Sequence, residues 1–154
     1  MLPPLVKTID VPCSQEMAFT VFLNDMQSWW PLGKFSVSAM GGKPSKSLRV
    51  DAKQGGQIVE TTADDREYLW GIIQTYDPYD YLSMDFHIPQ PMEKVESRSF
   101  LELRFTALGP ELTRVELKQS NWEAFGENAA MLQGGYGKGW AIIFEQSFRV
   151  ACGG

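Results

Sequence analysis

The sequence has 154 residues, of which 44% are hydrophobic and 21% are charged, with a formal net charge of -5 at pH 7. This length predicts a single domain over residues 1–154, and the acidic balance argues against nucleic acid or an anionic membrane surface as a partner. Because the chain has no run of ~20 apolar residues and begins without a signal-peptide pattern, we expect a cytoplasmic protein with no membrane insertion.

The first elements mix strand and helix. Residues 5–11 alternate apolar and polar side chains, which predicts a short strand. Ser14 can cap a helix over residues 15–25, and residues 26–32 predict one further helical turn. Residues 35–47 are rich in glycine, serine and proline, which predicts a polar loop.

The middle of the chain predicts consecutive strands separated by turn-forming clusters. The predicted strands span residues 47–52, 57–62, 67–76, 81–88, 99–108 and 112–121. Short connections favour antiparallel pairing of neighbours. Leu103 and Phe105 alternate with Glu102 and Arg104, so we expect one apolar face and one solvated face.

The last element is predicted to be a long amphipathic helix. Its apolar stripe consists of Trp140, Ile143, Phe144, Phe148 and Ala151. The apolar face of the sheet is the obvious partner for this stripe, so the fold class is α+β. We expect the glycines of residues 134–139 to form the turn at the helix entrance and to let Gly139 approach the sheet closely.

Those glycines do not match a nucleotide-binding motif. A phosphate-binding loop requires a hydroxyl residue after its lysine, whereas Gly139 follows Lys138. The spacing G-x-G-x-G also differs from the dinucleotide fingerprint G-x-G-x-x-G. We therefore expect no cofactor.

Cys13 and Cys152 lie near opposite ends of the chain, without C-x-x-C spacing and with only one histidine in the sequence. This set cannot supply the usual ligands of zinc, so we expect no metal site. A disulfide between the two cysteines stays open, although a reducing cytoplasm disfavours it.

Several strings in this order resemble a known superfamily. They are FLNDMQSWWPLG, QGGQIVET, EYLWGIIQTYDPYDYLSMDF, TRVELKQSNW and GGYGKGWAIIFEQSF. Over about residues 6–148 they resemble the START and polyketide-cyclase-like (SRPBCC) superfamily, in particular the branch named for homologues of the heat-shock-protein-90 ATPase activator. The resemblance implies a helix-grip fold, in which a curved antiparallel sheet of about seven strands wraps a long C-terminal helix and leaves an apolar cavity. Members bind lipids, sterols or plant hormones, serve polyketide cyclisation or toxin resistance, or stimulate a chaperone ATPase.

Strand parity and the helix stripe predict the side chains that would line such a cavity. They are Trp70, Met84, Phe86, Leu103, Phe105, Val115, Leu117, Trp140, Phe144 and Phe148. Each of these is individually expected to be core, because regular apolar spacing is first a packing feature. Gly71, next to Trp70, leaves room for a ligand or for a closely packed helix.

Glu60 and His87 are the candidate catalytic groups. Glu60 shares strand parity with Ile58, and the pattern does not decide which face points inward; a buried Glu60 would have a raised pKa and could orient a ligand. Parity places His87 on the solvent side with Asp85, so we expect a surface histidine.

Trp29 and Trp30 lie in a loop region, where two adjacent tryptophans should not both point into one core. Two arrangements stay open. One ring anchors the loop while the other closes the pocket mouth as a ligand contact, or both rings anchor the loop.

Three functions follow. The leading hypothesis is binding of a hydrophobic or amphipathic small molecule between the sheet and the C-terminal helix. The alternatives are a protein-interaction module that acts on a chaperone or another partner through the WWPLG loop or the polar sheet face, and a cyclase- or hydrolase-like enzyme that uses Glu60 or His87. No catalytic constellation requires the enzyme hypothesis.

Overall fold

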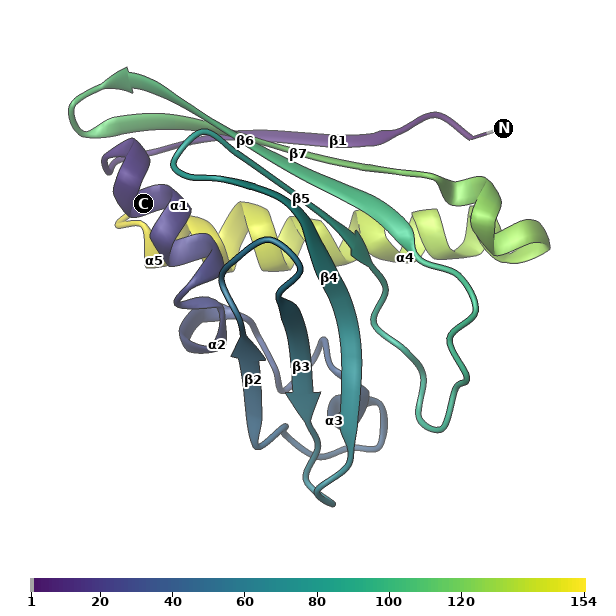
Figure 1. Ribbon diagram of the computed structural model, residues 1–154. Coiled ribbons are helices and arrows are strands. Elements are labelled where there is room, and N and C mark those ends of the chain that lie inside the picture. Colours follow the sequence, from purple (N-terminus) through teal and green to yellow (C-terminus); the bar gives the residue numbers. More distant parts are fainter. Residues whose placement is uncertain (1) are drawn as a thin grey trace.

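The computed structural model describes residues 2–154. One antiparallel sheet curves over a long C-terminal helical segment (Figure 1). Its strands are β1 (Leu5–Val11), β2 (Ser47–Val50), β3 (Gln57–Thr61), β4 (Glu67–Asp77), β5 (Tyr81–Phe86), β6 (Ser99–Gly109) and β7 (Leu112–Ser120). They lie in the order β1-β7-β6-β5-β4-β3-β2, so the last strand, β7, pairs with the first strand of the chain, β1. The predicted helix-grip fold is confirmed.

The helical segments follow β1 and β7. They are α1 (Gln15–Leu23), α2 (Met26–Trp29), α3 (Val37–Met40), η1 (Trp122–Asn128), α4 (Ala129–Ile142), the π-helical turn η2 (Ile143–Phe148) and α5 (Arg149–Ala151). The predicted cap of α1 is confirmed, because the Ser14 side chain accepts a hydrogen bond from the Met17 amide at 3.1 Å. The turn α3 lies in the segment predicted to be only a loop, and Ser36 caps it through the Ala39 amide.

Irregularities in the strands bend the sheet around the helix. The β3–β4 register shifts between Ile58 and Val59, opposite Gly71. A Cβ atom at Gly71 would lie 2.0 Å from the backbone oxygen of Asp85 in β5. The space beside Gly71 is therefore taken by the backbone of the neighbouring strand, and not by the ligand or helix predicted from the sequence.

The glycines of residues 134–139 lie inside α4, so their predicted role as a turn at the helix entrance is wrong. Glycine weakens a helix interior, but this helix is held by its packing. A Cβ atom at Gly137 would lie 3.2 Å from Leu5 Cδ1, and one at Gly139 would lie 3.6 Å from Phe35 Cε1. The approach to β1 at Gly137 is therefore tighter than a larger residue would normally allow, whereas the distance at Gly139 corresponds to ordinary van der Waals contact with Phe35.

The apolar stripe of the C-terminal helix packs against the concave face of the sheet. Trp140, Ile143, Phe144 and Phe148 are buried as predicted, and the rings of Phe22 and Phe148 lie 5.3 Å apart between centroids. Ala151, which was predicted to belong to the buried stripe, is exposed, and the next residue, Cys152, is buried instead. The π-helical turn inserts an extra residue before this point, which shifts the buried face by one position.

Candidate functional site

The side chains predicted to line an internal cavity form a packed core. All ten of the strand and helix positions are at most 1% exposed: Trp70, Met84, Phe86, Leu103, Phe105, Val115, Leu117, Trp140, Phe144 and Phe148. They belong to one continuous apolar cluster. Their contact with a ligand stays a prediction, because within residues 2–154 none of them lines either of the pockets described below.

Trp29 and Trp30 both enter this core, which contradicts the expectation that adjacent tryptophans would diverge. They are 6% and 4% exposed, and their ring centroids lie 5.7 Å apart. The chain accommodates both because each indole N–H finds a backbone acceptor: Trp29 Nε1 donates to Val21 O at 2.7 Å and Trp30 Nε1 donates to Phe35 O at 2.8 Å. Of the two arrangements left open, both rings anchor the loop.

Glu60 is fully buried and holds the segment around α3 against the sheet. Its Oε1 accepts from the Val37 amide at 2.8 Å and from Trp70 Nε1 at 3.1 Å. Its Oε2 accepts from the Ser38 amide at 2.9 Å and from Ser45 Oγ at 2.6 Å. Four donors therefore surround this carboxylate, and the structure supports an anchoring role for it.

The main pocket is lined mainly by residues of α4, of the segment of residues 34–40 and of the β5–β6 connection of residues 87–98. Its volume is about 650 Å³. Its walls are largely apolar, and its lining residues are Lys34, Phe35, Met40, His87, Ile88, Gln90, Pro91, Met92, Glu93, Phe125, Asn128, Met131, Leu132, Gly135, Tyr136, Gly139 and Ile143.

Glycines of α4 leave part of this space open. Gly135 and Gly139 both line the main pocket. A Cβ atom at Gly135 or at the neighbouring Gly134 would meet no atom within 4 Å. The two positions differ in that Gly135 lines the pocket and Gly134 does not. The glycine-rich stretch therefore shapes a hollow in the helix surface.

A polar group stands in the wall of the main pocket. His87 is only 5% exposed, so its predicted surface position is wrong: β5 ends at Phe86, and the chain turns inward where strand parity no longer applies. His87 Nδ1 lies 3.1 Å from the Tyr136 hydroxyl, and His87 Nε2 lies 3.3 Å from Glu93 Oε2. The Tyr136 oxygen also accepts a hydrogen bond from the Ile88 amide at 2.8 Å.

One arrangement of protons satisfies all of these contacts. A neutral His87 with its proton on Nε2 can donate to the Glu93 carboxylate, and its Nδ1 then accepts the hydroxyl proton of Tyr136, whose oxygen already receives the Ile88 amide. Burial lowers the pKa of His87 below its ordinary value, more strongly than Glu93 raises it. Burial also raises the pKa of Tyr136. The imidazole and the phenol are therefore both neutral at pH 7.

A second buried polar chain supports the pocket wall from behind. Trp140 Nε1 donates to Gln119 Oε1 at 2.8 Å, and Gln119 Nε2 donates to Ser99 Oγ at 2.9 Å. Ser99 Oγ in turn donates to Phe86 O at 2.6 Å. This network ties α4 to β7, β6 and the end of β5, and so fixes the position of the adjoining His87.

A smaller pocket of about 340 Å³ adjoins the main one. It is lined by Val37, Ser38, Gly41, Lys43, Thr62, Ala63, Asp64, Arg66, Tyr68, Pro91 and Met92. Pro91 and Met92 line both pockets. This second pocket is more polar than the main one, and it contains the side chains of Lys43 and Arg66.

Comparison with known proteins identifies the family. The model of the family described as "Activator of Hsp90 ATPase homolog 1-like protein" matches residues 13–149. The chain belongs to this family. No curated protein matches the sequence significantly.

Solved structures share the fold of this Hsp90 ATPase activator homologue-like chain. CalC from Micromonospora echinospora, a self-sacrificing resistance protein, is 23% identical with a TM-score of 0.70, covering 97% of this chain and 94% of CalC. An anthrahydroquino-γ-pyrone synthase is 29% identical with a TM-score of 0.61, covering 86% of this chain and 85% of the synthase. An Hsp90 activator from Plasmodium falciparum is 15% identical with a TM-score of 0.65, covering 97% of this chain and 96% of that one.

We did not predict from the sequence that Tyr136, Glu93 and Phe125 line a pocket. Tyr136 lies four residues before Trp140, so the helical stripe extended backwards indicates it. The surrounding glycines obscured that signal. Glu93 lies in an irregular connection, where no periodicity indicates which side chains turn inward.

Other predicted features concern cysteines, metals and membranes. Cys13 and Cys152 are free thiols. Among residues 2–154 there is no cluster of three or more metal-ligating side chains. In the same part of the chain, each helix is too short or too polar to cross a bilayer.

Proposed function

We propose that this protein binds a hydrophobic or amphipathic small molecule in the main pocket. The observation that carries the proposal is an apolar pocket of about 650 Å³ with a polar group in its wall, formed by the neutral side chains of His87 and Tyr136 and by the carboxylate of Glu93. Pockets for small organic ligands are typically ~300–1,000 Å³, mostly apolar, with a few placed polar groups. This location lies to one side of the packed core, and differs from the space between sheet and helix predicted from the sequence.

Exposed methionines around the pocket support this proposal. Met40, Met92 and Met131 line the pocket and are among the few large apolar side chains that face solvent. A ligand would cover this apolar surface, and methionine adapts its shape to different partners. We infer that the rim tolerates ligands of more than one shape.

The structural relatives agree with a ligand-binding function. One is a synthase whose name identifies its product as an anthrahydroquino-γ-pyrone, and CalC is a resistance protein. The alternative of a protein partner at the WWPLG loop loses the two tryptophans as contacts, because Trp29 and Trp30 are buried. Such a partner would have to bind the remainder of the loop, residues 31–33, or the polar sheet face. The enzyme alternative is better served by His87, which lines the pocket, than by Glu60, whose oxygens are all occupied.

The test compares two variants of adjacent glycines, Gly135→Phe and Gly134→Phe. Both substitutions replace a glycine of α4 that has open space beside it, but only Gly135 lines the pocket. A panel of fatty acids, sterols and polycyclic aromatic compounds is screened by native mass spectrometry and thermal shift. At 100 times Kd a ligand stabilises the protein by about 2.7 kcal/mol, which corresponds to roughly 5–10 °C in Tm.

We expect the native protein and Gly134→Phe to bind and to shift, and Gly135→Phe to lose both responses. Equal binding by both variants would place the ligand elsewhere. The absence of any bound mass or thermal shift across the panel in the native protein would refute ligand binding.

A further inference from the structure

A short piece of chain separates the main pocket from the second pocket. Pro91 and Met92 of the β5–β6 connection line both spaces. Met92 is 70% exposed and has φ of 65°, a left-handed conformation that methionine rarely adopts. Beside Pro91, the movable part of this partition is therefore one flexible, largely exposed side chain on strained backbone.

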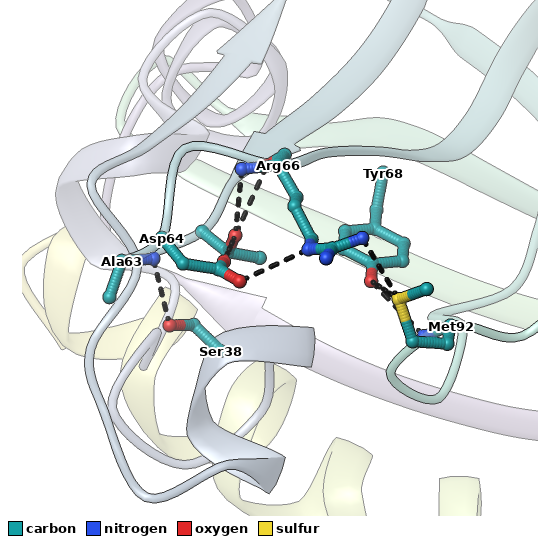
Figure 2. Close-up of polar contacts among 7 residues, drawn as sticks. Ser38, Ala63, Asp64, Arg66, Tyr68 and Met92 are labelled. Carbon is teal, nitrogen blue, oxygen red and sulfur yellow. Dashed lines mark hydrogen bonds and ion pairs between the residues drawn. The ribbon is translucent and has the colours of Figure 1, made fainter.

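Three polar contacts involve Met92 (Figure 2). Its amide donates to the Tyr68 hydroxyl at 3.1 Å, and its sulfur accepts from Arg66 Nη1 at 3.0 Å. The Tyr68 hydroxyl also approaches the sulfur at 3.9 Å. Because a thioether is a weak acceptor, the hydrogen bond from the Arg66 guanidinium to the Met92 sulfur is weak.

The charges of the second pocket favour an anion at this point. Arg66 Nε pairs with Asp64 Oδ2 at 3.1 Å, and the hydrogen bond from Thr62 together with Arg66 lowers the pKa of Asp64. Lys43 lines the same pocket and forms no ion pair within residues 2–154. Two cations and one anion leave one positive charge in excess. A ligand carboxylate would be a stronger acceptor for Arg66 than the Met92 sulfur.

The main pocket presents the opposite preference around its polar group. Glu93 stands there beside a neutral His87, so an anion placed against this wall would meet a carboxylate. Lys34, at the rim of the main pocket, is the competing cation.

We propose that the ligand is an elongated amphipathic anion that spans both pockets. Its apolar body occupies the main pocket, and its anionic end displaces the Met92 side chain and binds Arg66 and Lys43. This inference rests on the proposed function, because it requires the main pocket to hold the body of the ligand.

Dodecanoate and its methyl ester test the anionic end, since they share a chain and differ in charge. Binding is measured by isothermal titration calorimetry on the native protein and on Arg66→Gln. We expect dodecanoate to bind at least about 10-fold tighter than the ester, and Arg66→Gln to remove this preference by weakening dodecanoate alone. Lys43→Gln, at an exposed residue, is a second variant that should weaken dodecanoate in the same direction.

Met92→Gly tests the partition, because glycine keeps the left-handed conformation and removes the side chain. We expect dodecanoate to bind several-fold tighter to Met92→Gly, and Met131→Ala, at the rim of the main pocket only, to show no such gain.

Three results would overturn the inference. Equal affinity for dodecanoate and its ester, sensitive to Gly135→Phe, would leave the proposed function intact and refute the anionic end. Loss of the preference in Lys34→Gln, but not in Arg66→Gln, would place the carboxylate in the main pocket. If neither probe binds, and if the ligand panel gives no difference in bound mass or thermal shift between the native protein and Gly135→Phe, the proposed function itself is refuted.

Discussion

Replacing Glu60 with glutamine isolates the role of the buried carboxylate. The substitution keeps the size of the side chain and exchanges one acceptor oxygen for an NH₂ group. At the Oε1 position, that group would face the Val37 amide and the Trp70 indole, two donors that cannot reverse. At the Oε2 position, it would face the Ser38 amide and the hydroxyl of Ser45, which can turn and accept. Glutamine will therefore place its NH₂ at Oε2 and leave the Ser38 amide without a partner.

The cost follows from this geometry. An unsatisfied buried donor costs about 1–3 kcal/mol, and each remaining hydrogen bond loses the strength that the charge provides. Removing a buried charge also removes its desolvation penalty, which offsets part of the loss. We expect Glu60→Gln to lower the free energy of unfolding by about 3 kcal/mol, or roughly 6–12 °C in Tm.

Thermal unfolding monitored by circular dichroism measures the effect. Glu67→Gln is the matched control, because Glu67 is an exposed residue whose 3.6 Å pair with Arg49 contributes little. If Glu60→Gln melts within about 2 °C of the control, the four hydrogen bonds do not hold the segment around α3, and the reasoning fails.

Three further predictions concern single positions. The pKa of His87, the only histidine, should lie below its unperturbed ~6.5 in an NMR titration. Because the unfolded chain then binds the proton more readily, stability should fall as the pH drops from about 6.5 toward the folded-state pKa; a measured value above 6.5 would contradict the burial argument. Gly71→Ala should be strongly destabilised or insoluble, since its Cβ would lie 2.0 Å from the Asp85 oxygen, and a native-like melt would show that β4 and β5 can separate there. Gly134→Ala should raise the stability by roughly 0.5–1 kcal/mol in chemical denaturation, because the added methyl meets no atom within 4 Å; a loss of stability would indicate that the helix is strained at this point.

The sequence by itself determined the strands, the first helix and the α+β class of the fold. Alternation in the strands and the stripe of Trp140, Phe144 and Phe148 specified which faces are apolar, and packing these faces together gives the α+β class. The helix-grip arrangement itself was indicated by the family resemblance. The cap at Ser14 was also readable, because it depends on a hydrogen bond between residues close in the chain. These features are local and periodic.

The tertiary structure alone decided where the pocket lies. Parity ends where β5 ends, so the inward turn of His87 and its meeting with Glu93 and Tyr136 depend on an irregular connection and on a helix far along the chain. Glu60 became an anchor because a distant segment brings four donors to it. The glycines of α4 acquired their meaning only from what stands opposite them: atoms of Leu5 and Phe35 in two cases, and open space at Gly135. Contacts between residues far apart in sequence carry no periodic signal, and these contacts separate a filled core from an open pocket.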